Sequence, residues 1–183
     1  MNITVIGRGH VGGGLARLWE KAGHEVRTLG RDGGDASDAD VVVVAVPGNQ
    51  IAAALSGVTG LNGQVTIDAT NLYSERDPAF PSLAHQVKSI VGGPTAKSFN
   101  TVFASAYDQI GTQRVTPSNL FAAEPAAKDI TAQLITAAGF DPLYVGDLDP
   151  GARLLEDSSG LTRALAGQIG GPFFYRYGRP GEL

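Results

Sequence analysis

Residues 5–14 read VIGRGHVGGG, with five glycines in ten positions. A strand-like run at 2–6 precedes them, and an amphipathic helical pattern at 11–22 follows. Gly7, Gly9 and Gly12 have the spacing G-x-G-x-x-G, which permits a tight turn, close approach of backbone to a pyrophosphate, and close packing of helix on strand. The N-terminus of such a helix offers N–H groups and a positive dipole end to phosphates. The stretch therefore predicts a dinucleotide-binding turn.

The rest of the chain alternates short branched-aliphatic runs with longer amphipathic stretches, which is typical of βαβ units around a parallel sheet. Further strands are expected at 25–29, 40–46, 64–68, 95–99, 119–123 and 143–145. Further helices are expected at 50–56, 81–91, 125–138 and 151–168. We therefore predict an α/β, Rossmann-like doubly wound fold with a mostly parallel sheet. Residues 1–183 would form a single dinucleotide-binding domain that ends in a helix and a tail.

One unit of that fold is predicted to be missing. A helix and a third strand normally follow the second strand, yet only residues 32–40 separate Arg31 from Val41. This gap is too short for both, so the βα unit after the second strand is predicted to be deleted, with 30–40 forming a loop. We expect a shallower adenine pocket and a different sheet edge.

The end of the second strand indicates which nucleotide binds. NAD-binding domains place an acidic side chain there, about 20 residues after the glycines, to hold the ribose hydroxyls. Here the strand ends at Leu29 and Gly30, and Arg31 follows with a guanidinium that suits a 2′-phosphate. Thr28 and the Gly30 N–H are secondary donors. The sequence therefore favours NADP, although Asp32 could point back to the ribose.

Several polar residues admit two interpretations. Arg8, inside the glycine turn, is either a second phosphate or adenine contact or a surface residue. His10 points either at phosphate or into solvent. No pair among His10, His24 and His85 has metal-ligand spacing, so no metal site is predicted. The three aspartates of the 30–40 segment lack the closing glutamate of a calcium loop and are interpreted as a polar loop; they are Asp35, Asp38 and Asp40.

Composition narrows the functional classes. With 43% hydrophobic and 17% charged residues and a net charge of -4, the chain is expected to be a soluble protein that binds neither nucleic acid nor an anionic membrane surface. The absence of cysteine excludes disulfides, thiolate metal sites and cysteine nucleophiles. Since no targeting segment precedes the first strand and no apolar run reaches membrane-spanning length, a cytoplasmic location is expected.

Four stretches carry a family resemblance: ITVIGRGHVGGGLARLWEKAGHEVRTLGRD, DADVVVVAVP, VTIDATN and AKSFNTVFA. They resemble the NADP-binding domain of the coenzyme-factor-420-dependent NADP oxidoreductases, a group that includes the cytosolic domain of the transmembrane ferric reductases of the prostate epithelial antigen family. The resemblance covers most of the chain to about Val145. It implies NADPH as the hydride source and a small-molecule redox partner, either a deazaflavin (factor 420) or a flavin such as FMN or FAD.

The resemblance also implies roles for individual residues. The 2′-phosphate would lie on Arg31, and Asn71 and the segment 97–100 would lie nearer the nicotinamide. The pyrophosphate would lie on the glycine turn, made of Gly7, Arg8, Gly9, His10, Val11 and Gly12. The wall beside the adenosine half would be Ala45, Val46 and Pro47.

The acceptor site is not evident from the sequence. Carbonyl-reducing relatives build theirs from a long helical domain, whereas only residues 146–183 remain here. The acceptor is therefore expected on the domain surface, under the tail, or at the interface of a homodimer. The tail aromatics would either stack on a tricyclic ring or anchor the C-terminus; they are Phe173, Phe174, Tyr175 and Tyr177.

Tyr73 and Lys97 are the remaining candidates for a proton donor, although a structural role is favoured for each. The resulting hypothesis is an NADP-dependent oxidoreductase that transfers hydride to a flavin-type or deazaflavin acceptor. The alternative is a non-catalytic NADP-binding sensor or interaction module.

Overall fold

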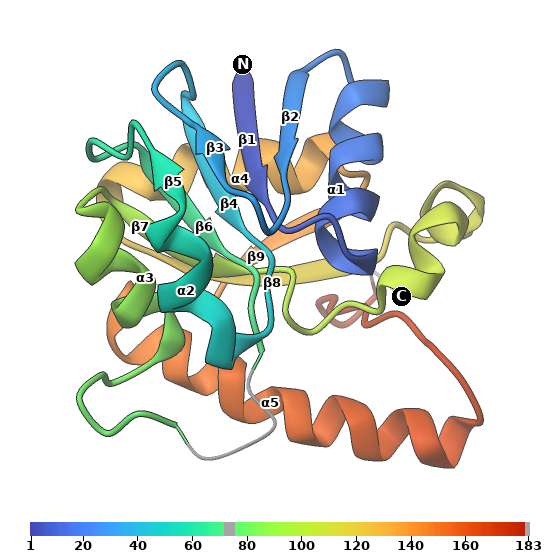
Figure 1. Ribbon diagram of the computed structural model, residues 1–183. Coiled ribbons are helices and arrows are strands. Elements are labelled where there is room, and N and C mark those ends of the chain that lie inside the picture. Colours follow the sequence, from blue (N-terminus) through green and yellow to red (C-terminus); the bar gives the residue numbers. More distant parts are fainter. Residues whose placement is uncertain (72–75, 182–183) are drawn as a thin grey trace.

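The computed structural model describes residues 1–71 and 76–181. Its centre is a seven-stranded sheet in the order β2-β1-β4-β6-β7-β8-β9 (Figure 1). Every neighbouring pair is parallel except β7 and β8, which run antiparallel. The predicted Rossmann-like, mostly parallel sheet is confirmed. Its strands are β1 (Asn2–Ile6), β2 (Glu25–Leu29), β4 (Val41–Val44), β6 (Val65–Asp68), β7 (Thr95–Ser98), β8 (Ser118–Ala123) and β9 (Asp141–Tyr144).

Helices cover both faces of the sheet. The α-helices are α1 (His10–Lys21), α2 (Ile51–Ser56), α3 (Leu83–Val91), α4 (Pro125–Ala137) and α5 (Leu148–Ile169), and two 3-10 helices are η1 (Gly48–Gln50) and η2 (Ala104–Thr112). One buried cluster holds side chains of α1 and α4, and a second holds those of α2 and α3. The long helix α5 packs on α3, β7 and β8 and forms the lower edge of Figure 1.

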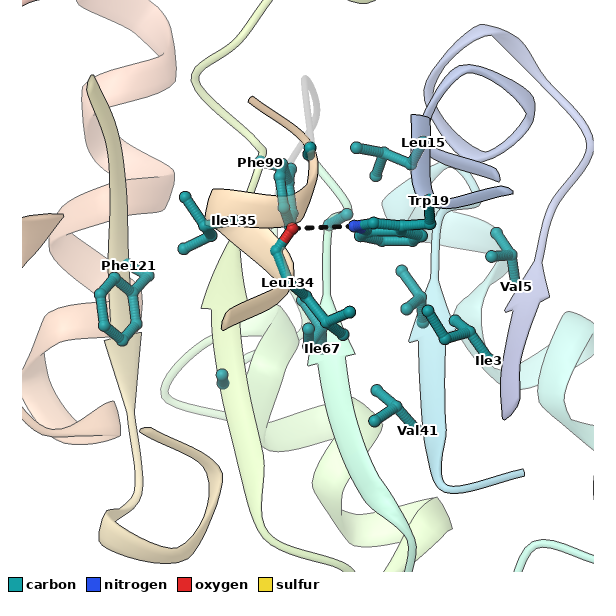
Figure 2. Close-up of a cluster of buried hydrophobic side chains, with 14 of the residues drawn as sticks. Ile3, Val5, Leu15, Trp19, Val41, Ile67, Phe99, Phe121, Leu134 and Ile135 are labelled. Carbon is teal, nitrogen blue, oxygen red and sulfur yellow. Dashed lines mark hydrogen bonds between the residues drawn. The ribbon is translucent and has the colours of Figure 1, made fainter. Parts of the chain in front are cut away.

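The core explains why β4 is a run of four valines. Val41 and Val43 belong to the first cluster and Val42 and Val44 to the second, so the strand is buried on both faces. In the first cluster, the fully buried Trp19 of α1 donates from Nε1 to the Leu134 carbonyl of α4 at 2.8 Å (Figure 2). This bond satisfies the one polar atom of the largest core side chain and ties α1 to α4.

The sheet ends at β2, as expected if the following βα unit is deleted. The chain reverses after β2 in a turn closed by the Gly33 N–H, which donates to the Gly30 carbonyl at 3.2 Å. The segment 30–40 is more than the expected loop, because it includes the short strand β3 (Gly34–Asp35), which pairs in parallel with β5 (Val58–Thr59). The Cβ of any residue at Gly33 would lie 1.8 Å from the Gly57 carbonyl oxygen, so this close crossing requires glycine.

Some boundaries differ from the sequence-based expectation. β4 ends at Val44, two residues early, and the last strand is at Asp141–Tyr144 instead of 143–145. Helix α5 begins at Leu148 and continues across non-helical dihedrals at Asp149. Helix η2 was not expected. Within the described ranges, no helix is long and apolar enough to cross a membrane.

The C-terminal tail lies along the start of β8. The Ser118 N–H donates to the Tyr175 carbonyl at 2.8 Å, and Arg176 pairs with Asp141. The tail rings also pack inward, Phe173 on Phe103 and Phe174 on Phe140. These contacts support the interpretation of the aromatic tail as an anchor for the C-terminus.

Candidate functional site

The turn between β1 and α1 needs glycine at two of its three motif positions because of contacts with the protein itself. Gly7 has a φ of +117°, and a Cβ there would lie 2.3 Å from the Ala45 carbonyl oxygen. A Cβ at Gly12 would lie 2.0 Å from the Gly7 carbonyl oxygen. Gly9 is different, because among the described residues no atom beyond its two chain neighbours lies within 4 Å of its Cβ position. The space beside Gly9 is therefore open to a ligand.

The N-terminus of α1 faces the same space. The helix begins at His10, with Gly9 as its N-cap residue, and no side chain caps it. Its first turn carries no acidic residue. The first N–H groups of a helix have no intrahelical partners, and with the helix dipole they attract anions. His10 is exposed at this helix end.

Arg8 links the turn to the end of β2. Its guanidinium donates to the Thr28 carbonyl, from Nε at 3.2 Å and from Nη2 at 2.9 Å. Its Nη1 lies 3.4 Å from the Cβ position of Gly30. Arg31 and Asp32 are the exposed central residues of the turn from Gly30 to Gly33. The structure thus brings Arg8 to the strand end at which the sequence placed Arg31, a proximity that the sequence did not reveal.

The residues after β4 form a wall beside the glycine turn. Ala45 donates its N–H to the Ile6 carbonyl at 2.8 Å, and Val46 Cγ1 lies 3.2 Å from the Cβ position of Gly7. Pro47 is exposed, and the next N–H, of Gly48, donates to the Asn71 carbonyl at 3.0 Å. The ends of β4 and β6 are thereby fastened together.

A cavity of about 190 Å³ continues from the turn towards β6, β7 and α5. Its lining includes Val11 and Asn71, both predicted to be in the binding site, and side chains that the sequence did not suggest. The full lining is Val11, Ala69, Asn71, Phe99, Asn100, Thr101, Val102, Phe103, Ala104, Ser159, Thr162 and Arg163. Asn71 Nδ2 donates to the Asn100 carbonyl at 2.6 Å, so the ends of β6 and β7 are also joined.

Lys97 belongs to a buried ion network. Its Nζ lies 2.7 Å from Asp68 Oδ2 and 3.4 Å from Glu156 Oε1, and all three side chains are almost inaccessible to solvent. Lys97 also donates to the Thr70 carbonyl at 2.7 Å, and Arg76 Nε lies 3.1 Å from Glu156 Oε2. Two cations thus neutralise two carboxylates between the sheet and α5. This arrangement gives Lys97 a structural role. The other candidate proton donor, Tyr73, lies outside the described residues.

The three aspartates of the 30–40 segment have separate partners. Asp38 pairs with Arg27 at 2.7 Å, and Asp40 accepts from the Asn2 N–H at 2.8 Å. Asp35 accepts from the Ser37 hydroxyl at 2.6 Å, and this hydrogen bond lowers the pKa of the Asp35 carboxyl. The carboxylates serve the turn and strand contacts of this segment. Across residues 1–71 and 76–181, no group of three or more metal-ligating side chains is found.

The chain matches known proteins in structure and not in sequence comparisons. No protein-family model and no curated sequence matches it. It is similar to a provisionally named factor-420-dependent NADP reductase from an Arthrobacter species, with 25% identity, a TM-score of 0.79, and coverage of 97% of this chain and 99% of that one. A hypothetical protein from Sinorhizobium meliloti matches at 25% identity and a TM-score of 0.66, covering 83% and 88%.

The fold also extends to larger enzymes. A reductive aminase from Aspergillus terreus, solved with NADPH, matches at 16% identity and a TM-score of 0.64. The match covers 92% of this chain and only 63% of the aminase. At this identity the likeness concerns the fold alone.

Proposed function

We propose that this chain is an NADP(H)-dependent oxidoreductase that transfers hydride between NADPH and a planar acceptor of the deazaflavin or flavin type. The observation that carries the proposal is the open space at Gly9, beside the uncapped N-terminus of α1. Arg8, in the same turn, reaches the end of β2, which Arg31 follows. The full-length similarity to the Arthrobacter protein supports the same activity.

The residues of the turn fit a pyrophosphate. Gly7 and Gly12 are glycines because backbone atoms fill the space around them, whereas Gly9 has no such constraint within the protein. A glycine with open space at a helix N-terminus is what close approach of phosphate oxygens to backbone N–H groups requires. These contacts therefore favour a dinucleotide-binding turn over a flexible turn without function.

The end of β2 fits a 2′-phosphate. Arg31 is exposed in the turn after the strand, and Arg8 is held beside it by the Thr28 carbonyl. A guanidinium binds phosphate oxygens bidentately and stays charged at any physiological pH. Two cations at this position favour NADP over NAD despite the neighbouring Asp32.

The cavity limits where the acceptor binds. An engineered protein cavity of about 150 Å³ holds one benzene molecule, so about 190 Å³ accommodates one substituted ring. When bound, the nicotinamide would supply the hydride, and Val11 and Asn71 would position its ring. A tricyclic acceptor would bind beside that ring, on the side formed by Ser159, Thr162 and Arg163 of α5.

The lining chemistry favours a flavin-type acceptor. Reduction of a carbonyl needs an acid to protonate the developing oxyanion, usually a histidine, lysine or tyrosine. Among the described residues, the cavity lining includes none of these and no carboxylate. A reduced flavin or deazaflavin delocalises its charge and takes its proton from solvent. The same lining also fits the alternative of a non-catalytic NADP-binding module.

Nucleotide binding tests the proposal first. Calorimetric titration should show saturable binding of NADPH, with NADH binding at least tenfold more weakly because it lacks the 2′-phosphate. Titration with 2′,5′-ADP, which keeps the phosphate and lacks the nicotinamide, should retain part of this affinity. Equal affinity for NADPH and NADH would contradict the assignment of the two arginines, and no binding of either would contradict the proposed function.

A further inference from the structure

One residue of the cavity lining has a buried polar atom without a partner among the described residues. Asn100 follows β7, is 7% exposed and lines the cavity. Its Nδ2 donates to the Leu155 carbonyl of α5 at 2.7 Å and to Asn71 Oδ1 at 3.2 Å. Its Oδ1 is buried, and no hydrogen-bond partner for it is found among the described residues.

The orientation of this amide is determined by its contacts. A backbone carbonyl only accepts hydrogen bonds, so the atom facing the Leu155 carbonyl must be the nitrogen of Asn100. Asn71 is fixed in the same way, because its Nδ2 donates to the Asn100 carbonyl at 2.6 Å. Neither amide can flip without losing its hydrogen bond to a backbone carbonyl, so Asn100 Oδ1 stays in place as an acceptor.

The backbone beside this residue is strained. Phe99, the residue before Asn100, has a φ of +61°, and it is the one non-glycine residue with a positive φ in the described chain. Residues in this region persist where surrounding contacts enforce them, and they cluster at ligand sites. Here the fully buried Phe99 ring packs edge-on to Trp19, at 5.7 Å between centroids. The strain therefore fixes the direction in which the next side chain leaves the sheet.

We propose that Asn100 Oδ1 accepts a hydrogen bond from an amide N–H on a planar ring bound in the cavity, and so makes the site specific for rings that carry this donor. The inference rests on the proposed function, because that function supplies two rings of this kind. One is the nicotinamide with its carboxamide, and the other is the pyrimidine ring of a flavin or deazaflavin with its ring N–H. A ring that carries the donor gives this buried acceptor its missing partner, whereas an analogue without the donor leaves the acceptor unpartnered, so the analogue should bind more weakly.

Ligand analogues test the proposal on the unmodified protein. The first arm compares NADP with its 3-acetylpyridine analogue, in which a methyl ketone replaces the carboxamide and removes the N–H donor. The second arm compares FMN with N3-methyl FMN in the presence of NADP. We expect about tenfold or greater weakening in one arm, measured by calorimetry, and the affected arm identifies the ring that contacts Asn100.

Two variants test whether Asn100 distinguishes the two ligands of the affected pair. Asn100→Ala should bind both members of that pair equally, and Asn62→Ala, which truncates an exposed asparagine outside the cavity lining, should keep the wild-type preference. Since the wild-type comparison needs no substitution, poor folding of Asn100→Ala would leave that comparison intact. Normal NADPH binding without discrimination in either arm would overturn the inference and leave the proposed function standing. A preference that persists in folded Asn100→Ala would also overturn it, and failure to bind NADPH at all would overturn both.

Discussion

Replacing Arg31 with alanine should distinguish the two nicotinamide dinucleotides. The Arg31 side chain is exposed at the tip of the turn from Gly30 to Gly33, and it makes no hydrogen bond or ion pair with another described residue. Its loss should therefore leave the fold unchanged. A hydrogen bond to a charged group contributes about 1.5–3 kcal/mol, which corresponds to roughly 10- to 150-fold weaker NADPH binding.

The neighbouring Arg8 limits how much NADPH affinity is lost in Arg31→Ala. Its guanidinium stays beside Gly30 through the Thr28 carbonyl, so one cation remains near the 2′-phosphate in the variant. NADH, which lacks this phosphate, should bind with nearly unchanged affinity. The difference should shrink at high salt, because exposed charges are screened over about 10 Å at 0.1 M ionic strength.

Calorimetry of NADPH and NADH with wild type and Arg31→Ala measures this effect. Lys21→Ala is the matched control, since it removes the same charge from the opposite end of α1, roughly 16 Å along the helix axis. It should change neither affinity. Equal losses for both nucleotides in Arg31→Ala would refute the assignment of Arg31 to the 2′-phosphate.

Two further substitutions test the turn and the buried network. Gly9→Val should abolish binding of both nucleotides while the far-ultraviolet circular dichroism stays native, because a Cβ at this position has open space around it and the side chain would occupy the pyrophosphate's place; retained affinity would show that this glycine has no role in binding. Lys97→Met should lower the free energy of unfolding by about 3–5 kcal/mol, since two buried carboxylates would keep only Arg76 as a counter-charge. Lys88→Met, which removes a partly exposed pair with Glu124, should cost less than about 1 kcal/mol in the same denaturant titration. Similar losses in both lysine variants would argue against the structural role assigned to Lys97.

Local patterns made the first half of the fold predictable. The glycine spacing after β1 and the valine run of β4 are each read from adjacent residues, and the strand, turn and helix around the glycines and the strand at the valines are confirmed in the structure. The short gap between Arg31 and Val41 likewise predicted a deleted βα unit and a different sheet edge, and the observed sheet ends at β2. Counting residues was enough there, because a helix and a strand need a minimum length of chain.

Contacts between distant residues were not predictable in this way. Gly14 is a glycine because a Cβ there would lie 2.5 Å from the Tyr107 ring of η2, a helix that the sequence did not indicate. The residues near Lys97 in the sequence do not indicate its pairing with Glu156, which lies 59 positions later on α5. Asn100 likewise owes its orientation to Leu155, which comes within reach only once α5 has packed on the sheet.

The acceptor preference tests the account most directly. The protein should be mixed with NADPH and oxidised factor 420, FMN or a flavin-linked ferric chelate, while the absorbance of the reduced nicotinamide is followed. A parallel panel should contain aldehydes, ketones, imines and 2-oxo acids. The account predicts saturable NADPH oxidation with at least one deazaflavin or flavin acceptor and negligible oxidation with the panel. Efficient turnover of a carbonyl or imine would contradict it, and so would tight NADPH binding without turnover of any acceptor, the result expected of a non-catalytic module.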